Sequence, residues 1–196
     1  VRYSNSYIVD VNYDGVDEIF LTAFDRVSSA MVMTAYGFRN GECTEISQTP
    51  LSSDVKNVVK ITKSTKPGQW GLSLYVDSLT ATGGYITDIV ELRSGVLTNT
   101  TLGSGSKRSA ATWRPVNITC QDIDNDGMPE VPLADMLPGY TDPEAADTLW
   151  KLRWTRFENG NTNGVAVETF HSPADGWYFQ WPETWGSNVS AQRKRE

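Results

Sequence analysis

The sequence contains few of the residues on which enzymes most often rely. It has one histidine, His171, and two cysteines, neither of which belongs to a metal-binding or redox motif. A lone histidine cannot form a two-histidine metal-hydrolase site, no nucleophile-elbow motif accompanies it, and no glycine-rich phosphate loop is present. We therefore expect no catalytic residues and a protein that is not an enzyme, with His171 exposed at the end of a strand.

Long hydrophobic runs and an excess of positive charge are also missing. No apolar run approaches the roughly 18 residues that a membrane-spanning helix needs, so no transmembrane segment is expected. The chain has 24 acidic and 17 basic residues, a net charge of −7, which argues against nucleic acid as a partner. We expect any signal peptide or lipid anchor to lie upstream of Val1.

The two cysteines, Cys43 and Cys120, leave two alternatives open. A disulfide between them would close a long loop. The chain-entropy model predicts that such a loop stabilises the folded state by about 4–5 kcal/mol. The other alternative is two buried free thiols, because Cys120 lies two residues before Asp122 on a face expected to point inward.

An acidic motif occurs twice in the chain. Each copy has oxygen-bearing side chains at positions 1, 3, 5 and 9, with glycine at position 6 where the backbone must bend sharply. Such a set suits Ca²⁺, which takes six to eight oxygen ligands at about 2.3–2.6 Å. With position 7 contributing its backbone carbonyl, the predicted ligands are Asp10, Asn12, Asp14, Val16 and Glu18 in the first loop, and Asp122, Asp124, Asp126, Met128 and Glu130 in the second. The alternative is a pair of turns capped by their own backbone amides.

These loops begin like EF-hands but do not end like them. The twelfth position is Leu21 in the first copy and Leu133 in the second, so the bidentate glutamate of an EF-hand is missing. Apolar residues alternate on both sides: Ile19 and Leu21 follow the first loop, and the segment 116–120 precedes the second. A period of two predicts strands, so the motif lies between strands rather than helices.

A D-x-[DN]-x-D-G-x-x-[DE] pattern between strands resembles the calcium loops of FG-GAP and VCBS repeats. These repeats occur in integrin-type β-propellers and in many bacterial surface proteins, including secreted lipoproteins. Both loops match at every ligand position, with Glu18 and Glu130 where the family more often has aspartate. The resemblance covers the two loops and extends to the rest of the chain only through periodicity. It implies a structural calcium cofactor and an extracellular or cell-surface location.

Glycines at a fixed spacing indicate an internal repeat. Gly15, Gly71 and Gly127 are each 56 residues apart. A second series of turns, centred on 40–41, 94–95 and 159–160, follows in the same order and predicts hairpins. We infer three units, about 1–54, 55–110 and 111–172. The middle unit has Lys66, Gly68 and Trp70 in place of the first three acidic-loop ligands, so we expect it to keep the geometry of the loop but to bind no metal.

The predicted fold is all-β, with repeated antiparallel blades of three to four strands arranged as a partial or small β-propeller. The alternative is a β-sandwich with two calcium-stapled hairpins. Three units fall short of the four to eight blades that usually close a propeller. The aromatic-rich segment 173–196 is expected to be a further β segment, either a fourth blade or the start of another module.

Seven tryptophans raise the question of carbohydrate binding, because flat aromatic faces stack on sugar rings. Trp150 and Trp154 alternate with polar residues and are expected in the core. The candidate ligand-binding residues are Trp177, Trp181 and Trp185, with Trp70 and Trp113 as the next candidates because each borders a turn or connector.

The expected function is that of a non-enzymatic secreted or cell-surface binding or adhesion protein with structural Ca²⁺ in the two loops. Its partner would be an extracellular protein or a glycan, read by loops gathered on one face. The alternative is a carbohydrate-binding module or the β domain of a carbohydrate-active enzyme.

Overall fold

The computed structural model describes residues 3–142, 148–172, 177–186 and 188–192. The protein is all-β, as expected, with three four-stranded antiparallel sheets and no α-helix among the described residues. The first sheet consists of β1 (Tyr3–Val9), β2 (Glu18–Asp25), β3 (Ala30–Arg39) and β4 (Glu42–Pro50). The second consists of β5 (Val55–Lys63), β6 (Leu74–Thr80), β7 (Tyr85–Arg93) and β8 (Val96–Asn99). The third consists of β9 (Val131–Met136), β10 (Trp150–Glu158), β11 (Asn161–Ser172) and β12 (Trp177–Gln180). Two short 3₁₀ turns, η1 (Ala110–Thr112) and η2 (Glu183–Trp185), complete the described elements.

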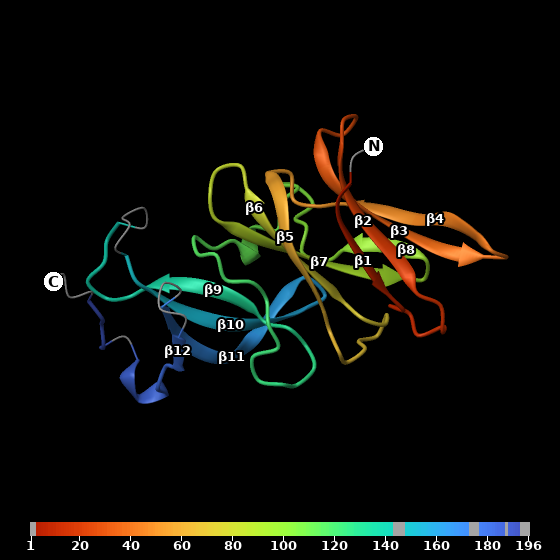
Figure 1. Ribbon diagram of the computed structural model, residues 1–196. Coiled ribbons are helices and arrows are strands. Elements are labelled where there is room, and N and C mark those ends of the chain that lie inside the picture. Colours follow the sequence, from red (N-terminus) through yellow and green to blue (C-terminus); the bar gives the residue numbers. More distant parts are fainter. Residues whose placement is uncertain (1–2, 143–147, 173–176, 187, 193–196) are drawn as a thin grey trace.

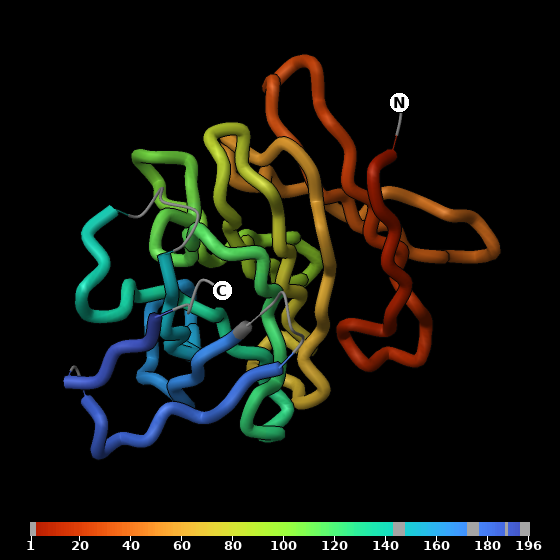
Figure 2. Tube along the Cα trace, turned by 60° about the vertical axis from the view of Figure 1, so that its left-hand side comes forward, coloured from red at the N-terminus to blue at the C-terminus, as the bar shows by residue number. Residues whose placement is uncertain are grey.

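Each sheet is a meander in which consecutive strands pair with their neighbours. The first and third sheets lie at opposite ends of the molecule, with the second sheet between them (Figures 1 and 2). The arrangement is consistent with blade-like units. Among the described residues, no helix is both long and apolar enough to cross a membrane.

Two hydrophobic cores hold the sheets together, one on each face of the second sheet. Successive residues of β6 point to opposite faces, so Leu74 and Val76 pack against Phe20 and Met33 of the first sheet. Tyr75, between them, belongs to the core shared with the third sheet. The central sheet is therefore buried on both faces, which explains why β6 has an almost continuous run of buried residues.

The three predicted hairpin turns are confirmed, and they share one backbone conformation. Both central residues have positive φ in each turn: 54° and 82° at residues 40–41, 49° and 81° at 94–95, and 49° and 79° at 159–160. Positive φ at both positions is the signature of the type I′ turn, whose twist matches that of the strands it joins. The repeat is therefore visible in the backbone as well as in the sequence.

The third sheet is built differently from the other two. In the first sheet Val9 of β1 pairs with Glu18 of β2, and the corresponding residues Gln121 and Glu130 form only an isolated bridge. The strand predicted over 116–120 is therefore wrong. Its backbone groups have other partners: the Ile118 carbonyl accepts a hydrogen bond from Arg114 Nε at 2.7 Å, and the amide of residue 120 donates to a carboxylate of β6.

Strand β12 supplies the fourth strand of the third sheet by pairing with the outer side of β11. It belongs to the segment 173–196, which was expected to form a β segment outside the three repeats. Beyond it, Trp181 packs with Leu137, Leu149 and Phe170 in a third, smaller core. The Tyr140 hydroxyl donates to the carbonyl of residue 191 at 3.0 Å and ties the chain beyond β12 to the loop after β9.

Both cysteines are free thiols, and only one of them is buried. Cys120 has no exposed surface and lies in the core between the second and third sheets, whereas Cys43 is exposed on β4. His171 is half-buried rather than exposed, because its ring stacks on Tyr178 of β12 at a centroid distance of 4.9 Å. The pairing of β12 with β11, which sequence periodicity did not reveal, covers this histidine.

A buried ion pair links β6 to the segment that precedes the second loop. Arg114 Nη2 lies 2.6 Å from Asp77 Oδ1, and both side chains have no exposed surface. The same carboxylate accepts hydrogen bonds from the Thr87 hydroxyl at 2.7 Å and the Cys120 amide at 2.9 Å. These contacts satisfy both charges in the interior, which buried ions require.

Candidate functional site

The first acidic loop joins β1 to β2 and is stabilised by its own side chains. The Asp10 carboxylate accepts hydrogen bonds from the amides of Asp14 at 3.1 Å and Gly15 at 2.9 Å. The Asp14 amide also donates to Asn12 Oδ1 at 2.9 Å, and the Val16 amide donates to Asp14 Oδ1 at 2.9 Å. The side chains at positions 1, 3 and 5 therefore face the interior of the loop, as a ligand set must.

The second acidic loop, which precedes β9, repeats these contacts residue by residue. Asp122 accepts from the amides of Asp126 and Gly127, both at 2.9 Å. The Asp126 amide also donates to Asp124 at 3.2 Å, and the Met128 amide donates to Asp126 Oδ1 at 2.8 Å. Two segments more than a hundred residues apart thus adopt one conformation, because the same residue types stand at the same positions.

The backbone of the two loops agrees as well, and the middle loop departs from it. Tyr13 and Asn125, at position 4, have φ of 61° and 60°, and the glycines that follow at position 6 also have positive φ. In the middle unit Gly71 keeps a φ of 96°, but Gln69, at position 4, is not left-handed. The expectation that the middle unit keeps the loop geometry is therefore wrong at this position. Without acidic side chains to accept them, its backbone amides close a bridge between Gly68 and Gly71 instead.

The glutamate at position 9 is the most buried member of each set. Glu18 is 3% exposed and Glu130 has no exposed surface. In both loops one carboxylate oxygen accepts a backbone hydrogen bond from position 2, from Val11 at 3.0 Å and from Ile123 at 3.1 Å. Burial raises the pKa of Glu18, and the charges of the neighbouring aspartates add to the effect.

In the second loop one carboxylate oxygen of Glu130 lacks a hydrogen-bond partner. Burial raises the pKa of Glu130 to about 7, opposed by the Ile123 amide, while the charges of Asp124 and Asp126 raise it further and Arg156 lowers it. The Oε1 atom of Glu130 is buried and has no hydrogen-bond partner. A buried carboxylate oxygen without a partner is costly, so the loop favours an additional positive group at this point.

In each loop a nitrogen group lies among the acidic side chains. In the first loop Asn12 Nδ2 donates to Asp14 Oδ2 at 3.1 Å and to Glu18 Oε1 at 2.9 Å. In the second loop the guanidinium of Arg156, from β10, pairs with Asp124 and lies 3.6 Å from Glu130 Oε1. The sequence offered no sign of this arginine, because it lies 32 residues beyond Asp124 and only the sheet brings it near.

The second loop has the donor atoms to hold a metal ion. Carboxylate oxygens of Asp122, Asp124 and Glu130 lie within 4.8 Å of one another, and of the described residues only this loop brings three acidic side chains so close. The donors are all oxygens, which hard cations prefer. An ion here would also give the unpartnered Glu130 Oε1 a ligand, so the residues present fit a metal.

The three candidate tryptophans of the C-terminal segment differ in exposure. Trp177 is 49% exposed and Trp185 is 38% exposed, but Trp181 is only 3% exposed and its ring lies in the small third core. A sugar ring therefore has no access to Trp181. Trp154 is fully buried, and Trp150 is partly buried, in line with the core positions expected for both.

No protein-family model matches the chain, and comparisons with curated proteins and with solved structures gave no match either.

Proposed function

We propose that this chain is a non-enzymatic binding protein of the cell surface or extracellular space, related to FG-GAP and VCBS repeat proteins, with structural Ca²⁺ in its two acidic loops. The observation that carries the proposal is the repeated loop geometry. Four backbone amides of each loop make five hydrogen bonds to side chains at the same positions, and a buried glutamate closes each set.

The ligand chemistry favours calcium over magnesium. Magnesium demands near-ideal octahedral geometry at about 2.0–2.1 Å and keeps several waters, whereas calcium accepts irregular shells of six to eight oxygens. In the second loop Asp122, Asp124, Asp126 and Glu130 would bind the ion through side chains, and Met128 through its carbonyl. The corresponding residues of the first loop are Asp10, Asn12, Asp14 and Glu18, with Val16. The ion would neutralise carboxylates that otherwise repel one another.

The role of the ion in this proposal is structural. The first loop joins β1 to β2, and the second joins the Arg114 segment to β9, so an ion in each loop would fix the direction in which strands enter their sheets. The loops are thereby held rigid beside the type I′ turns, which lie at the same ends of the strands. Loops held on a rigid β scaffold are a common place for partner recognition.

A thermal melt in EDTA and in about 5 mM CaCl₂, with MgCl₂ as the control for ion selectivity, tests the proposal. For dissociation constants of about 10⁻⁴–10⁻³ M, typical of extracellular modules, linkage gives about 1–2 kcal/mol per site. That corresponds to a rise of roughly 2–8 °C for each occupied site in a domain of this size. No calcium-specific rise would overturn the calcium role.

Three variants locate the effect. Asp14→Ala and Asp126→Ala should each remove part of the calcium-dependent rise, because each deletes one ligand and the acceptor of one backbone amide in its loop. Gln69→Ala, in the middle loop, should leave the rise unchanged. Equal calcium responses in all three variants and the parent would mean that the acidic loops are turns without an ion.

Carbohydrate binding is the second candidate function, and one observation favours it. The tryptophan of the middle loop, Trp70, lines two neighbouring pockets, and their lining suggests a particular class of ligand.

A further inference from the structure

The middle loop forms a wall shared by two pockets. The 2–3 pocket lies between the second and third sheets and has a volume of about 290 Å³, near the lower end of the roughly 300–1,000 Å³ of small-ligand sites. The 1–2 pocket lies between the first and second sheets and has a volume of about 670 Å³. Gln69 and Trp70 line both. The unit that lost its acidic ligands thus has a tryptophan at position 5, between the two acidic loops.

Trp70 is held in place by contacts that leave it half-buried. The Arg93 guanidinium lies over its ring, 6.0 Å from the centroid. Arg93 is in turn fixed by Glu91, whose carboxylate accepts from Arg93 Nε at 2.8 Å and from the Ser73 hydroxyl at 3.0 Å. Arg93 also donates to Asn159 of the third sheet at 3.2 Å. The aromatic wall is therefore preorganised, which lowers the entropy cost of binding.

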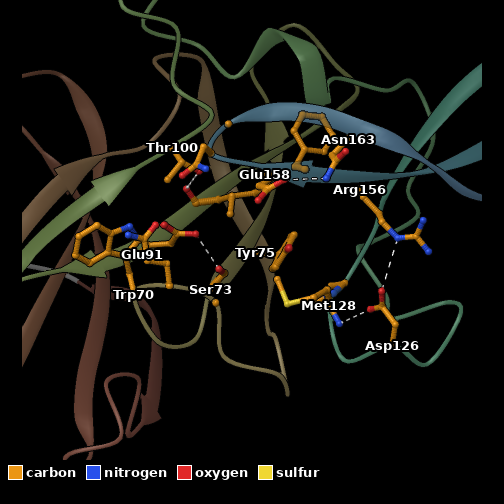
Figure 3. A pocket seen from close by; sticks show the side chains of 17 residues that line it. Trp70, Ser73, Tyr75, Glu91, Thr100, Asp126, Met128, Arg156, Glu158 and Asn163 are labelled. Atoms are coloured by element: carbon orange, nitrogen blue, oxygen red, sulfur yellow. Dashed lines mark hydrogen bonds and ion pairs between the residues drawn. The ribbon is translucent and has the colours of Figure 1, made fainter.

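The 2–3 pocket combines aromatic rings with hydrogen-bonding groups of every kind. Figure 3 shows Trp70 and Glu91 on one side, Arg156 and Asp126 on the other, and Tyr75 between them. Tyr75 lines the pocket although its side chain is only 1% exposed, and its hydroxyl has no hydrogen-bond partner among the described residues. A hydroxyl that lines a pocket and has no protein partner can hydrogen-bond to a polar ligand or water there.

Each charged group of this lining has a polar or charged partner. Glu91 is matched by Arg93 at 2.7 Å, Asp126 lies 3.7 Å from Arg156, and Glu158 accepts from the Asn163 amide at 2.9 Å. An anionic ligand would meet the carboxylates, and a cationic one would meet Arg156. A neutral ligand with many hydroxyl groups meets neither penalty, and it can both donate to carboxylates and accept from amides and the guanidinium.

The 1–2 pocket offers the same combination on the other side of Trp70. Its lining includes the 49% exposed ring of Phe38, the polar side chains of Asn12 and Asp14, and the guanidinium of Arg39. A ligand that extends beyond one pocket would therefore find a second aromatic and polar surface. Chains of linked sugar rings have this character, because each ring has apolar faces and hydroxyl edges.

We propose that Trp70 is the stacking platform of a carbohydrate site and that a neutral oligosaccharide runs across it from the 2–3 pocket into the 1–2 pocket. Tyr75 donates a hydrogen bond to the sugar unit in the 2–3 pocket. The site rests on the proposed binding function and gives it a ligand class. Both pockets border an acidic loop, so calcium and the glycan should each strengthen binding of the other.

The test is binding to an array of neutral plant, fungal and bacterial oligosaccharides in CaCl₂, with sialylated and sulfated glycans as charge controls. The variants are Trp70→Ala, Tyr75→Phe and Trp177→Ala, the last altering an exposed tryptophan of β12 outside both pockets. We expect Trp70→Ala to weaken binding by at least about tenfold, since stacking on a preorganised ring is lost. Tyr75→Phe should weaken it about three- to tenfold through one lost hydrogen bond. Trp177→Ala should bind like the parent.

The results of the glycan array can be told apart from a failure of the proposal that the loops bind calcium. Binding retained in both Trp70→Ala and Tyr75→Phe but lost in Trp177→Ala would overturn this site and place the ligand on β12. A parent protein that binds no neutral glycan, or only charged ones or peptides, would overturn the ligand class. The calcium melt is measured on the same samples, and it reports on the loops and on folding whatever the array shows. Because Tyr75→Phe removes a single oxygen, it tests the site even where Trp70→Ala fails to fold.

Discussion

Arg156 of β10 pairs with Asp124 of the second acidic loop, and its Nε lies 3.6 Å from Glu130 Oε1 and 3.7 Å from Asp126 Oδ2. One guanidinium thus faces three of the carboxylates that would hold an ion. The arginine and a cation are alternatives for the same negative charge, because both cannot make close contact with all three groups at once.

We therefore expect Arg156→Gln to raise the calcium affinity of the second loop while lowering stability without calcium. The ion pairs are partly exposed, so their loss should reduce the free energy of unfolding in EDTA by up to about 1 kcal/mol. The corresponding gain in calcium affinity is up to about fivefold, and calorimetric titration measures it. Arg153→Gln removes an arginine of the same strand that pairs with Asp135, outside the loop, and should leave calcium affinity unchanged. Weaker calcium binding in Arg156→Gln would show that the arginine supports the site.

Two glycines in equivalent hairpins provide a matched pair for the contact between the second and third sheets. Gly41 and Gly160 have φ of 82° and 79°, so alanine is strained equally at both. A Cβ at Gly41 meets open space, whereas one at Gly160 would overlap the carbonyl oxygen of Thr100. Gly41→Ala should cost about 1–2 kcal/mol of unfolding free energy, and Gly160→Ala a further 1–3 kcal/mol or so.

Chemical denaturation with urea measures both variants, with the slope of the transition as a check that the unfolded states are alike. Equal losses at the two positions would mean that the turn of the third sheet does not pack on the chain after β8 in solution. The boundary of the 2–3 pocket, to which Thr100 and Gly160 both belong, would then differ from the one described.

Local patterns explain what was predictable from the sequence. The type I′ turns and the acidic loops depend on residues within a few positions, such as the glycine of each turn or the Asp10 carboxylate that accepts the Gly15 amide. Their conformations follow from the allowed φ of glycine and from hydrogen bonds within the loop. The three-unit repeat was inferred from the same kind of signal, since each unit has a type I′ turn and a glycine at the sixth loop position, although only the first and third units have the acidic side chains.

Contacts between distant residues explain what could not be predicted from the sequence. Arg156 reaches the second loop from another strand, and Arg114 takes the backbone carbonyl that a predicted strand would have used. Trp181 follows an exposed strand yet is buried, because the chain turns back over the loop that contains Leu137. No periodicity in a single segment records such pairings.

We expect removal of one charge of the buried Arg114–Asp77 ion pair to destabilise the fold more than removal of both. Arg114→Met leaves the Asp77 carboxylate buried without its counter-ion, which typically costs about 3–5 kcal/mol. Adding Asp77→Asn removes the second charge while keeping an oxygen for the Cys120 amide, so the double variant should recover part of the loss. Urea unfolding of the two single variants and the double variant measures the coupling. A cost below about 1 kcal/mol for Arg114→Met would show that the pair does not anchor the segment before the second loop.

The last prediction concerns the only histidine and its response to acid. His171 Nε2 is buried without a hydrogen-bond partner among the described residues, and burial lowers the pKa of the imidazole. A lowered pKa means that the folded state binds the proton more weakly than the unfolded state, in which the pKa is about 6.5. The stabilising contribution is therefore fully present above that value and is lost as the pH falls through the lower pKa of the folded protein.

His171→Phe should remove this pH-dependent contribution to stability and keep the aromatic stacking on Tyr178. In EDTA, the urea midpoint of the parent should fall more steeply from about pH 8 to about pH 5 than that of the variant. Carboxylates also titrate in this range, including Glu130 with its pKa of about 7, but they are common to both proteins and cancel in the difference. Parallel pH profiles would mean that the imidazole is not secluded in solution. A steeper fall in the variant would mean that the charged imidazole is stabilised, with its pKa shifted the opposite way.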